Sequence, residues 1–430
     1  MPKVDFGNKG IGGSRELLVS NIAAQYGLQI AKYVIPFITL PYLARVLGGD
    51  GYGIRSYVLS VMTIATTVLD FGFMTSATKS ISRTRSNIGR ASLVVGAVVE
   101  AKLLLVFIVG IALVPISMAI PLLSENQSYV AIAYASCAIN SLVPDYVFMG
   151  YERMSIMTIR YVVCKAVGLV LTFASIHSPS DLLLVPIIDV VSSIMAVVWT
   201  YFGMKRQFGI GVKFPSLSRG VDEFKRSSEV FVANFSTTLF NSYTTLVIGV
   251  VFGAVDVAYW SLASTVVSSV QSLYSPIFNS LYVYMISQLD ISYYKTIFIK
   301  GALAAVGIAF ITAIFSRPIM WVLGGDSYLD GAGIIAFTSP VIALSFCTIG
   351  LGWPLLGAFG FESGVMKSSL IAGMFTVIAV SGAALLGVQS LAIYAVIRCA
   401  SEAVLAIARG VVAVSHRREI KAKGEKANAK

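Results

Sequence analysis

The chain has 430 residues, of which 57% are hydrophobic and 12% are charged, and its mean hydropathy is +0.82. Soluble proteins carry roughly 25% charged residues, so this chain has too little polar surface to cover a soluble fold of its size. Its formal net charge of +11 follows from basic loops and a basic tail and does not require a nucleic-acid partner. The composition therefore predicts a membrane protein.

Apolar runs long enough to cross a bilayer core of roughly 30 Å recur along the whole chain. They are continuous and not alternating, which favours helices over a β-barrel. The sequence thus predicts an all-α polytopic membrane protein with about twelve transmembrane helices. The predicted spans are 19–43, 56–78, 93–118, 128–149, 155–176, 182–203, 229–252, 257–285, 294–316, 331–356, 366–386 and 390–412.

Lys and Arg are distributed unequally between the two sets of loops. With twelve spans both termini share one side, and the loops and termini on that side hold 24 Lys and Arg residues against 3 in the opposite loops. Cytoplasmic loops carry the excess of basic residues. We therefore expect both termini to be cytoplasmic, in a multi-pass protein of the bacterial cytoplasmic (inner) membrane.

The longest polar interruption divides the spans into two sets of six. We expect a six-helix lobe over 1–204, a cytoplasmic linker over 205–228 and a second six-helix lobe over 229–412, around a central cavity. A basic cytoplasmic tail is expected over 413–430, and its Lys-rich end, KAKGEKANAK at 421–430, is expected to be a disordered, lipid-facing anchor. Similar strings follow the first, seventh and ninth spans, which weakly indicates an internal repeat. They are VLGGDGYG at 46–53, VFGAVDVAYW at 251–260 and VLGGDSYL at 322–329.

Polar residues recur at helical spacing on one face of four spans, at matching places in the two halves. Packing between transmembrane helices explains one or two such residues per helix, but a continuous polar face is typical of the wall of a water-filled cavity between lobes. The faces comprise Asn21, Gln25, Gln29 and Lys32; Ser56, Ser60, Thr63, Thr67 and Asp70; Asn234, Thr238, Asn241 and Thr245; and Ser261, Ser264, Ser268, Gln271, Ser275 and Asn279.

Charged residues within spans are costly, at about 2.5–3.5 kcal/mol each on insertion scales, and persist when paired, hydrated or able to reach the membrane surface. Lys32, Lys165 and Arg398 lie deepest, and we expect a functional role for them. Arg398 can also pair with Glu402, four residues on. Four others lie near the cytoplasmic ends of their helices, where their side chains can extend to the surface. These are Glu100, Asp145, Arg160 and Arg409.

Metal or thiol chemistry is not indicated. The four cysteines lie in apolar runs without a CxxC pair, and the two histidines are far apart. Buried packing is the ordinary role of such cysteines. We expect no cofactor, no metal site and no catalytic residues.

Residues 35–87 and 144–154 resemble Wzx-type flippases of the multidrug/oligosaccharidyl-lipid/polysaccharide (MOP) exporter superfamily. The matching features are Pro41-Tyr42-Leu43, the turn from Val46 to Gly53, Asp70 to Phe73 at the end of the second span, and PDYVFMGYERM at 144–154. The resemblance implies two six-helix lobes that open alternately. It also implies transport of a polyprenyl-diphosphate-linked oligosaccharide for O-antigen or other surface polysaccharide, through a cationic cavity.

On this interpretation the substrate's anionic groups require cations and a hydrated polar wall. We expect Lys32, Lys165 and Arg398 to hold the anion, and Asp70, with Asp189, to couple transport to a proton or sodium ion. The expected partners are the lipid-linked oligosaccharide, the coupling ion, membrane lipids and other membrane proteins of polysaccharide assembly. The polar substrate contacts are expected at Gln25, Gln29, Asn241, Gln271 and Asn279.

Two other functions are open. A multidrug antiporter of the same superfamily would exchange a proton or sodium for an organic cation, but the many interior Lys and Arg residues disfavour a cationic solute. A membrane polysaccharide polymerase or ligase would need a large catalytic loop, whereas the predicted outward loops are short and offer only His177. The sequence therefore favours a transporter over an enzyme and does not identify the glycan.

Overall fold

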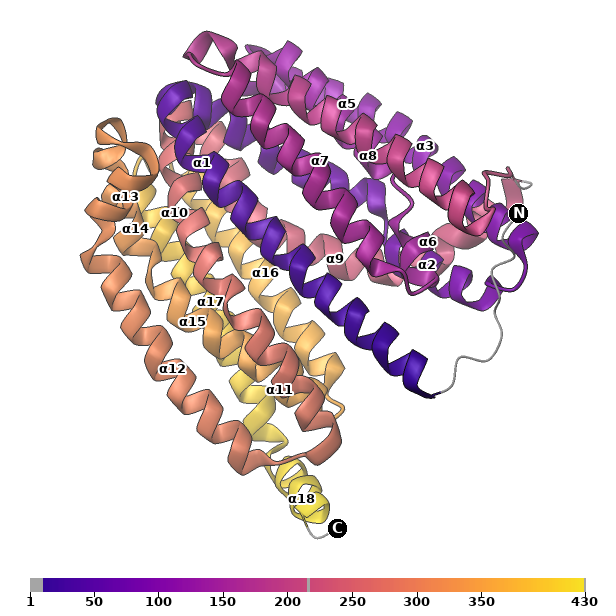
Figure 1. Ribbon diagram of the computed structural model, residues 1–430. Coiled ribbons are helices and arrows are strands. Elements are labelled where there is room, and N and C mark those ends of the chain that lie inside the picture. Colours follow the sequence, from indigo (N-terminus) through magenta and orange to yellow (C-terminus); the bar gives the residue numbers. More distant parts are fainter. Residues whose placement is uncertain (1–10, 215–216, 429–430) are drawn as a thin grey trace.

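The computed structural model describes residues 11–214 and 217–428, and within them it contains helices and no β-strand (Figure 1). The first lobe comprises α1 (Ile11–Asp70), α2 (Phe73–Thr84), α3 (Ile88–Ala119), α4 (Pro121–Ser124), α5 (Gln127–Ser141), α6 (Asp145–Gly150), α7 (Met154–Ser175), the 3₁₀ helix η1 (Pro179–Leu183) and α8 (Leu184–Phe208). The second comprises α9 (Leu217–Val251), α10 (Ala254–Ser272), α11 (Tyr274–Gln288), α12 (Ile291–Ile314), α13 (Ser316–Gly324), η2 (Asp326–Gly331), α14 (Ala332–Thr338), α15 (Pro340–Gly350), the π-helix η3 (Leu351–Gly357), α16 (Glu362–Leu385), α17 (Leu391–Ser415) and α18 (Arg417–Asn428).

Each predicted span is helical over most of its length. Among the described residues, nine helical stretches are long and apolar enough to cross a bilayer, and one of them, Gly27–Thr84, contains most of the first predicted span and all of the second. The seventh and eighth spans are not among the nine, since α9 is more polar and the eighth span is divided between α10 and α11. Large apolar side chains such as Phe107 and Leu303 are more than 60% exposed, as expected for a surface solvated by lipid.

Two prolines interrupt predicted spans, and one glycine forms a turn between two of them. Pro276 and Pro340 lie at the starts of α11 and α15, where a missing N–H interrupts the helical ladder. At Gly48 the backbone has φ 68°, a value that glycine adopts without steric cost. The chain therefore reverses there, where the sequence predicted a loop over 44–55.

Two predicted connections differ in the structure. The predicted linker over 205–228 is mostly helical, since α8 continues to Phe208 and α9 begins at Leu217. The short connection is held on α3, where the N–H of Lys213 donates to the Ser92 carbonyl at 3.2 Å. The prediction of a disordered end at 421–430 is wrong over 421–428, which lies in α18. Ile420 of this helix is buried, and its Lys423 donates to the Phe359 carbonyl at 3.0 Å. A buried apolar contact and a satisfied carbonyl together order this helix.

The two lobes meet at the end that carries the Gly48 turn, α13 and η2, here called the closed end. Arg45 donates to the Val322 carbonyl at 2.8 Å, and the Tyr328 hydroxyl donates to the Ala44 carbonyl at 2.9 Å. The strings at 46–53 and 322–329 thus lie against each other, and the Tyr52 and Tyr328 rings pack edge to face with centroids 6.4 Å apart. The repeated string forms matching halves of one contact.

Close packing of α1 against the start of α10 continues the contact between the lobes beyond the Gly48 turn. An ideal Cβ on Gly53 would lie 1.8 Å from the Ala254 carbonyl oxygen, so only glycine permits this approach. Farther along, the Thr67 and Thr238 hydroxyls are 3.1 Å apart. Toward the opposite end, where α1 begins and α18 ends, the helices of the two lobes diverge (Figure 1). The structure is closed at one end and splayed at the other.

Candidate functional site

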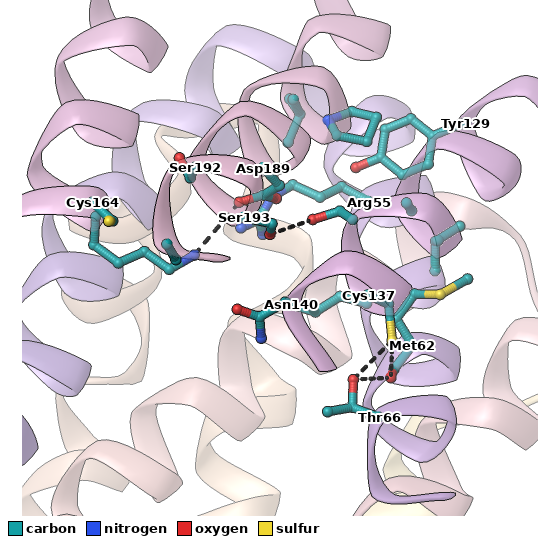
Figure 2. A pocket seen from close by; sticks show the side chains of 18 of the residues that line it. Arg55, Met62, Thr66, Tyr129, Cys137, Asn140, Cys164, Asp189, Ser192 and Ser193 are labelled. Carbon is teal, nitrogen blue, oxygen red and sulfur yellow. Dashed lines mark hydrogen bonds and ion pairs between the residues drawn. The ribbon is translucent and has the colours of Figure 1, made fainter. Parts of the chain in front are cut away.

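A cavity of about 250 Å³, here called the closed-end cavity, lies among α1, α5, α7 and α8 (Figure 2). Arg55 enters it from α1, and Lys165 of α7 lies 3.5 Å from Asp189 of α8, Nζ to Oδ1. Helices α7 and α8 pack side by side, which brings these two predicted site residues together. The polar groups that line this cavity also include Tyr129, Ser136, Asn140, Ser192 and Ser193.

A second cavity of about 270 Å³, here called the open-end cavity, lies among α1, α2, α6 and α7. It contains three of the predicted site residues on the first half of α1, namely Gln25, Gln29 and Lys32. The Lys32 ammonium lies 5.9 Å from the centroid of the Tyr161 ring, within reach of a cation–π interaction. Arg160 and Tyr161 line both cavities, so the two form adjoining parts of one polar region.

The charges lining the two cavities are unbalanced. Four cations face two carboxylates, which leaves a formal excess of two positive charges. Three other charged residues within the first lobe, Asp70, Glu100 and Lys102, line neither cavity. The cations are Lys32, Arg55, Arg160 and Lys165, and the carboxylates are Asp145 and Asp189.

The sequence predicted that the side chains of Arg160 and Asp145 extend to the membrane surface. In the structure they form an interior pair instead. Arg160 is 6% exposed, and its Nη2 lies 2.8 Å from Asp145 Oδ2 while Nη1 donates to Thr200 at 3.0 Å. Pairing in the interior lowers the cost of burying either charge alone. The pair forms the boundary between the two cavities.

Asp70, predicted to couple an ion, is paired as well. Its Oδ1 lies 3.6 Å from the Nζ of Lys102, which is 5% exposed and donates to the Ser141 carbonyl at 2.6 Å. Asp70 ends α1 and lines neither cavity. Both predicted ion-coupling carboxylates, Asp70 and Asp189, therefore have a lysine partner.

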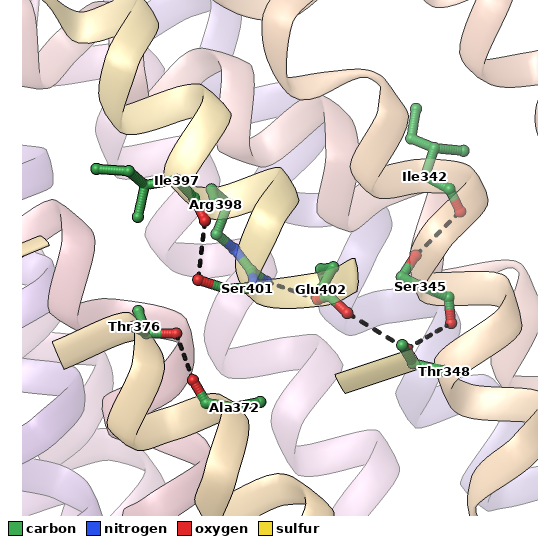
Figure 3. A network of polar contacts seen from close by, with 9 residues as sticks. All are labelled: Ile342, Ser345, Thr348, Ala372, Thr376, Ile397, Arg398, Ser401 and Glu402. Carbon is green, nitrogen blue, oxygen red and sulfur yellow. Dashed lines mark hydrogen bonds and ion pairs between the residues drawn. The ribbon is translucent and has the colours of Figure 1, made fainter. Parts of the chain in front are cut away.

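The predicted residues of the second lobe lie apart from these cavities. Arg398 of α17 donates to Glu402 at 2.9 Å, and Glu402 accepts from Thr348 of α15 at 3.3 Å (Figure 3). The Arg398 guanidinium lies 4.6 Å from the Phe240 ring centroid. The pair foreseen from the four-residue spacing is thus present. Three further predicted residues, Asn241, Gln271 and Asn279, lie on α9, α10 and α11 and line neither cavity.

Sequence reasoning missed Arg55 and Tyr161. It placed Arg55 in an outward loop because that residue follows an apparent loop, whereas the tight turn at Gly48 returns it into the helix bundle. Tyr161 adjoins Arg160, and its role in both cavities depends on the packing of α7 against α1. Within the described residues there is no group of three or more His, Cys, Asp and Glu side chains that could hold a metal ion.

The fold and its cavities define a polytopic helical membrane protein of the two-lobed type seen in transporters. A solved structure described as the inward-facing conformation of a multidrug resistance MATE family transporter of the MOP superfamily is similar over 91% of this chain and 98% of its own, with TM-score 0.66 and 12% identity. An outward-facing conformation of such a transporter gives TM-score 0.55 and 16% identity over 93% and 96% of the two chains.

Sequence comparison identifies the family. Residues 18–290 match the family described as polysaccharide biosynthesis protein, and this chain belongs to it. A protein of Escherichia coli K12 named as an O-antigen transporter is 22% identical over 357 residues, which cover 82% of this chain and 86% of that protein. The all-α two-lobed fold and the resemblance to Wzx-type flippases of the MOP superfamily are thereby confirmed.

Proposed function

We propose that this chain is a flippase that moves a lipid-diphosphate-linked oligosaccharide from the cytoplasmic to the outer leaflet by alternating access, for O-antigen or other surface polysaccharide. The observation that carries the proposal is the pair of adjoining cavities, whose charged side chains leave two excess positive charges. A bare diphosphate would meet a penalty of tens of kcal/mol in hydrocarbon. Cations and polar walls replace the water that it loses.

The predicted residues divide into three groups under this proposal. Lys32, with Gln25 and Gln29, holds the diphosphate from the open-end cavity, where the splayed lobes admit it. Lys165 contacts the anionic substrate farther in. Arg398 and the polar residues of α9 to α11 contact it from the second lobe once the lobes rearrange. Those polar residues are Asn241, Gln271 and Asn279.

Coupling to a proton or sodium ion is proposed at Asp70 and Asp189. Each carboxylate is paired with a lysine at 3.5–3.6 Å and is more than a third exposed. Binding of a proton or sodium ion would weaken the pair and free the lysine. The lysine freed at Asp189 is Lys165, which lines the closed-end cavity.

Export of an organic cation by a multidrug antiporter is the competing function, and lipid analysis separates the two. In a strain lacking this protein we expect the glycan-diphospholipid to accumulate at least several-fold over the parent strain. Wild-type protein should clear it, and Lys32→Ala protein at equal abundance should clear it poorly. Unchanged lipid pools together with raised drug susceptibility would favour the antiporter.

We propose that both termini face the cytoplasm, supported by the basic-residue asymmetry of the loops. Topology reporters fused after the C-terminus or inserted at Gly211 are expected to report the cytoplasm. Reporters at Asp50, Glu125 and Asp326 are expected to report the outside, which would make the closed end periplasmic. A cytoplasmic signal from Asp326 would reverse the orientation.

A further inference from the structure

One contact between the lobes lies far from the closed end. It is formed by the Phe71-Gly72 turn, which separates α1 from α2. Asp70, directly before the turn, lies about 33 Å of helix beyond Gly48 at 1.5 Å of rise per residue. Helix α9 of the second lobe packs against α1, α2 and α3 of the first (Figure 1). The lobes are therefore joined near the end at which their other helices diverge.

The backbone of this turn is held in an uncommon conformation. Phe71 has φ 44° and Gly72 has φ 78°. A residue with a Cβ atom rarely adopts a positive φ, and it keeps one only where its surroundings fix it. An ideal Cβ on Gly72 would lie 2.9 Å from the Ser227 carbonyl oxygen of α9. The second lobe therefore packs directly onto the strained turn of the first.

Aromatic rings and hydroxyl groups hold α9 on the turn. The Phe71 ring stacks on Phe231, with centroids 4.3 Å apart and planes at 13°, and it meets Phe224 edge to face at 5.1 Å. Aromatic pairs stabilise a contact beyond the area that they bury. The Ser76 hydroxyl of α2 lies 2.7 Å from the Ser227 hydroxyl, and Ser227 is fully buried. We call this contact, formed by Phe71, Gly72, Ser76, Phe224, Ser227 and Phe231, the joint.

Helix α9 is attached to both lobes. The connection before it rests on α3, where an ideal Cβ on Gly96 would lie 1.9 Å from the Lys213 carbonyl oxygen. Its later half packs on α16 of the second lobe, and the Tyr243 hydroxyl lies 2.6 Å from Ser381 Oγ. The covalent connection and the joint both limit how far the start of α9 can move away from the first lobe.

We propose that the joint stays intact while the closed end opens, so that the lobes rotate about it. Points near a rotation axis move least. A rotation of about 15°, as seen between subunits in known switches, moves a point about 33 Å from the axis by roughly 9 Å. Such a displacement separates Arg45 from the Val322 carbonyl, now 2.8 Å away. This inference rests on the proposed alternating access and adds which contact between the lobes persists.

A disulfide across the joint tests the proposal. Because the Ser76 and Ser227 hydroxyl oxygens are 2.7 Å apart, sulfur atoms at these positions can reach the roughly 2.05 Å of a disulfide. In cells treated with a membrane-permeant oxidant, Ser76→Cys/Ser227→Cys is expected to clear the glycan-diphospholipid within about 2-fold of its reduced form. Mass spectrometry gives the cross-linked fraction, and the two single-cysteine variants are the controls. The matched cross-link is Gly49→Cys/Val255→Cys at the closed end, which is expected to stop export.

The outcomes separate the joint from the function. A loss of at least about 10-fold in oxidised Ser76→Cys/Ser227→Cys, restored by reduction, would overturn the joint and leave the flippase proposal standing. Failure of the wild-type protein to clear the lipid would overturn the flippase proposal itself. Full export with the closed end cross-linked would overturn both the rotation and alternating access.

Spin-label distances in nanodiscs decide the question if the double-cysteine variant does not fold or cross-link. Labels at Lys79 and Val232, exposed on α2 and α9, are expected to stay within a few ångströms of one distance when polyprenyl diphosphate is added. Labels at Asp50 and Asp326, exposed at the closed end, are expected to gain a longer distance. Equal changes in both pairs would overturn the joint, and no change in either would count against alternating access as well.

Loss of the stacked ring is expected to loosen the joint. Phe231→Ala should lower export at least about 3-fold and broaden the distances between the labels at Lys79 and Val232. Phe107→Ala is the matched control, because Phe107 of α3 is 66% exposed, and it should change neither. Unchanged export and unchanged distances in Phe231→Ala would overturn the joint.

Discussion

Oxidation of a Gly49→Cys/Val255→Cys variant is expected to reduce glycan export at least about 10-fold, and reduction with dithiothreitol is expected to restore it. An ideal Cβ on Gly49 would lie 3.7 Å from the Cβ of Val255, within the roughly 3.5–4.5 Å found in disulfides. Alternating access requires the closed end to separate. A covalent bond between α1 and the start of α10 prevents that separation.

Each single-cysteine variant is the control for the bond, since it carries one new thiol and cannot form it. Both should export at near wild-type rates under oxidising conditions. Formation of the disulfide is measured by mass spectrometry of the α1 and α10 peptides before and after reduction. Full export by a fully cross-linked protein would contradict opening at this end and would require another path for the substrate.

The helices were predictable because continuous apolar runs leave few other structures in a membrane. The pair between Arg398 and Glu402 was predictable too, since four-residue spacing places both on one helical face. Boundaries set by local backbone geometry were harder to predict. The sequence predicted a loop over 44–55, whereas the chain turns at the single residue Gly48, which has a positive φ. Arg55, predicted to lie in that loop, therefore lies in a helix and lines a cavity.

Pairing between helices could not be predicted from one sequence. The partners of Lys165 and Arg160 depend on how α7 packs against α6 and α8, and helical periodicity gives the face of each helix but not its neighbour. For the same reason the polar faces of α9 and α10 were expected in the same cavity as Lys32, whereas Asn241 and Gln271 line neither cavity in this closed-end arrangement.

Removal of the Arg398 side chain is expected to destabilise the protein. Arg398 and Glu402 are 13% and 5% exposed at their side chains, with the atoms Nη2 and Oε1 2.9 Å apart. Breaking a buried ion pair by removing one partner typically costs about 3–5 kcal/mol, whereas replacing both partners with apolar residues is often neutral. We therefore expect Arg398→Ala to lower the melting temperature and the protein level, and Arg398→Met/Glu402→Leu to recover both.

Lys32→Ala is the comparison, because Lys32 is exposed and has no carboxylate partner among the described residues. It should keep the wild-type melting temperature and lose export.

The double variant separates the two roles of Arg398, since it restores the fold without restoring the cation. Per folded molecule we expect it to export at less than about half the wild-type rate if Arg398 contacts the substrate from the second lobe. Full export by the double variant would make Arg398 a structural residue only, and an unchanged melting temperature in Arg398→Ala would show that the pair contributes nothing to stability.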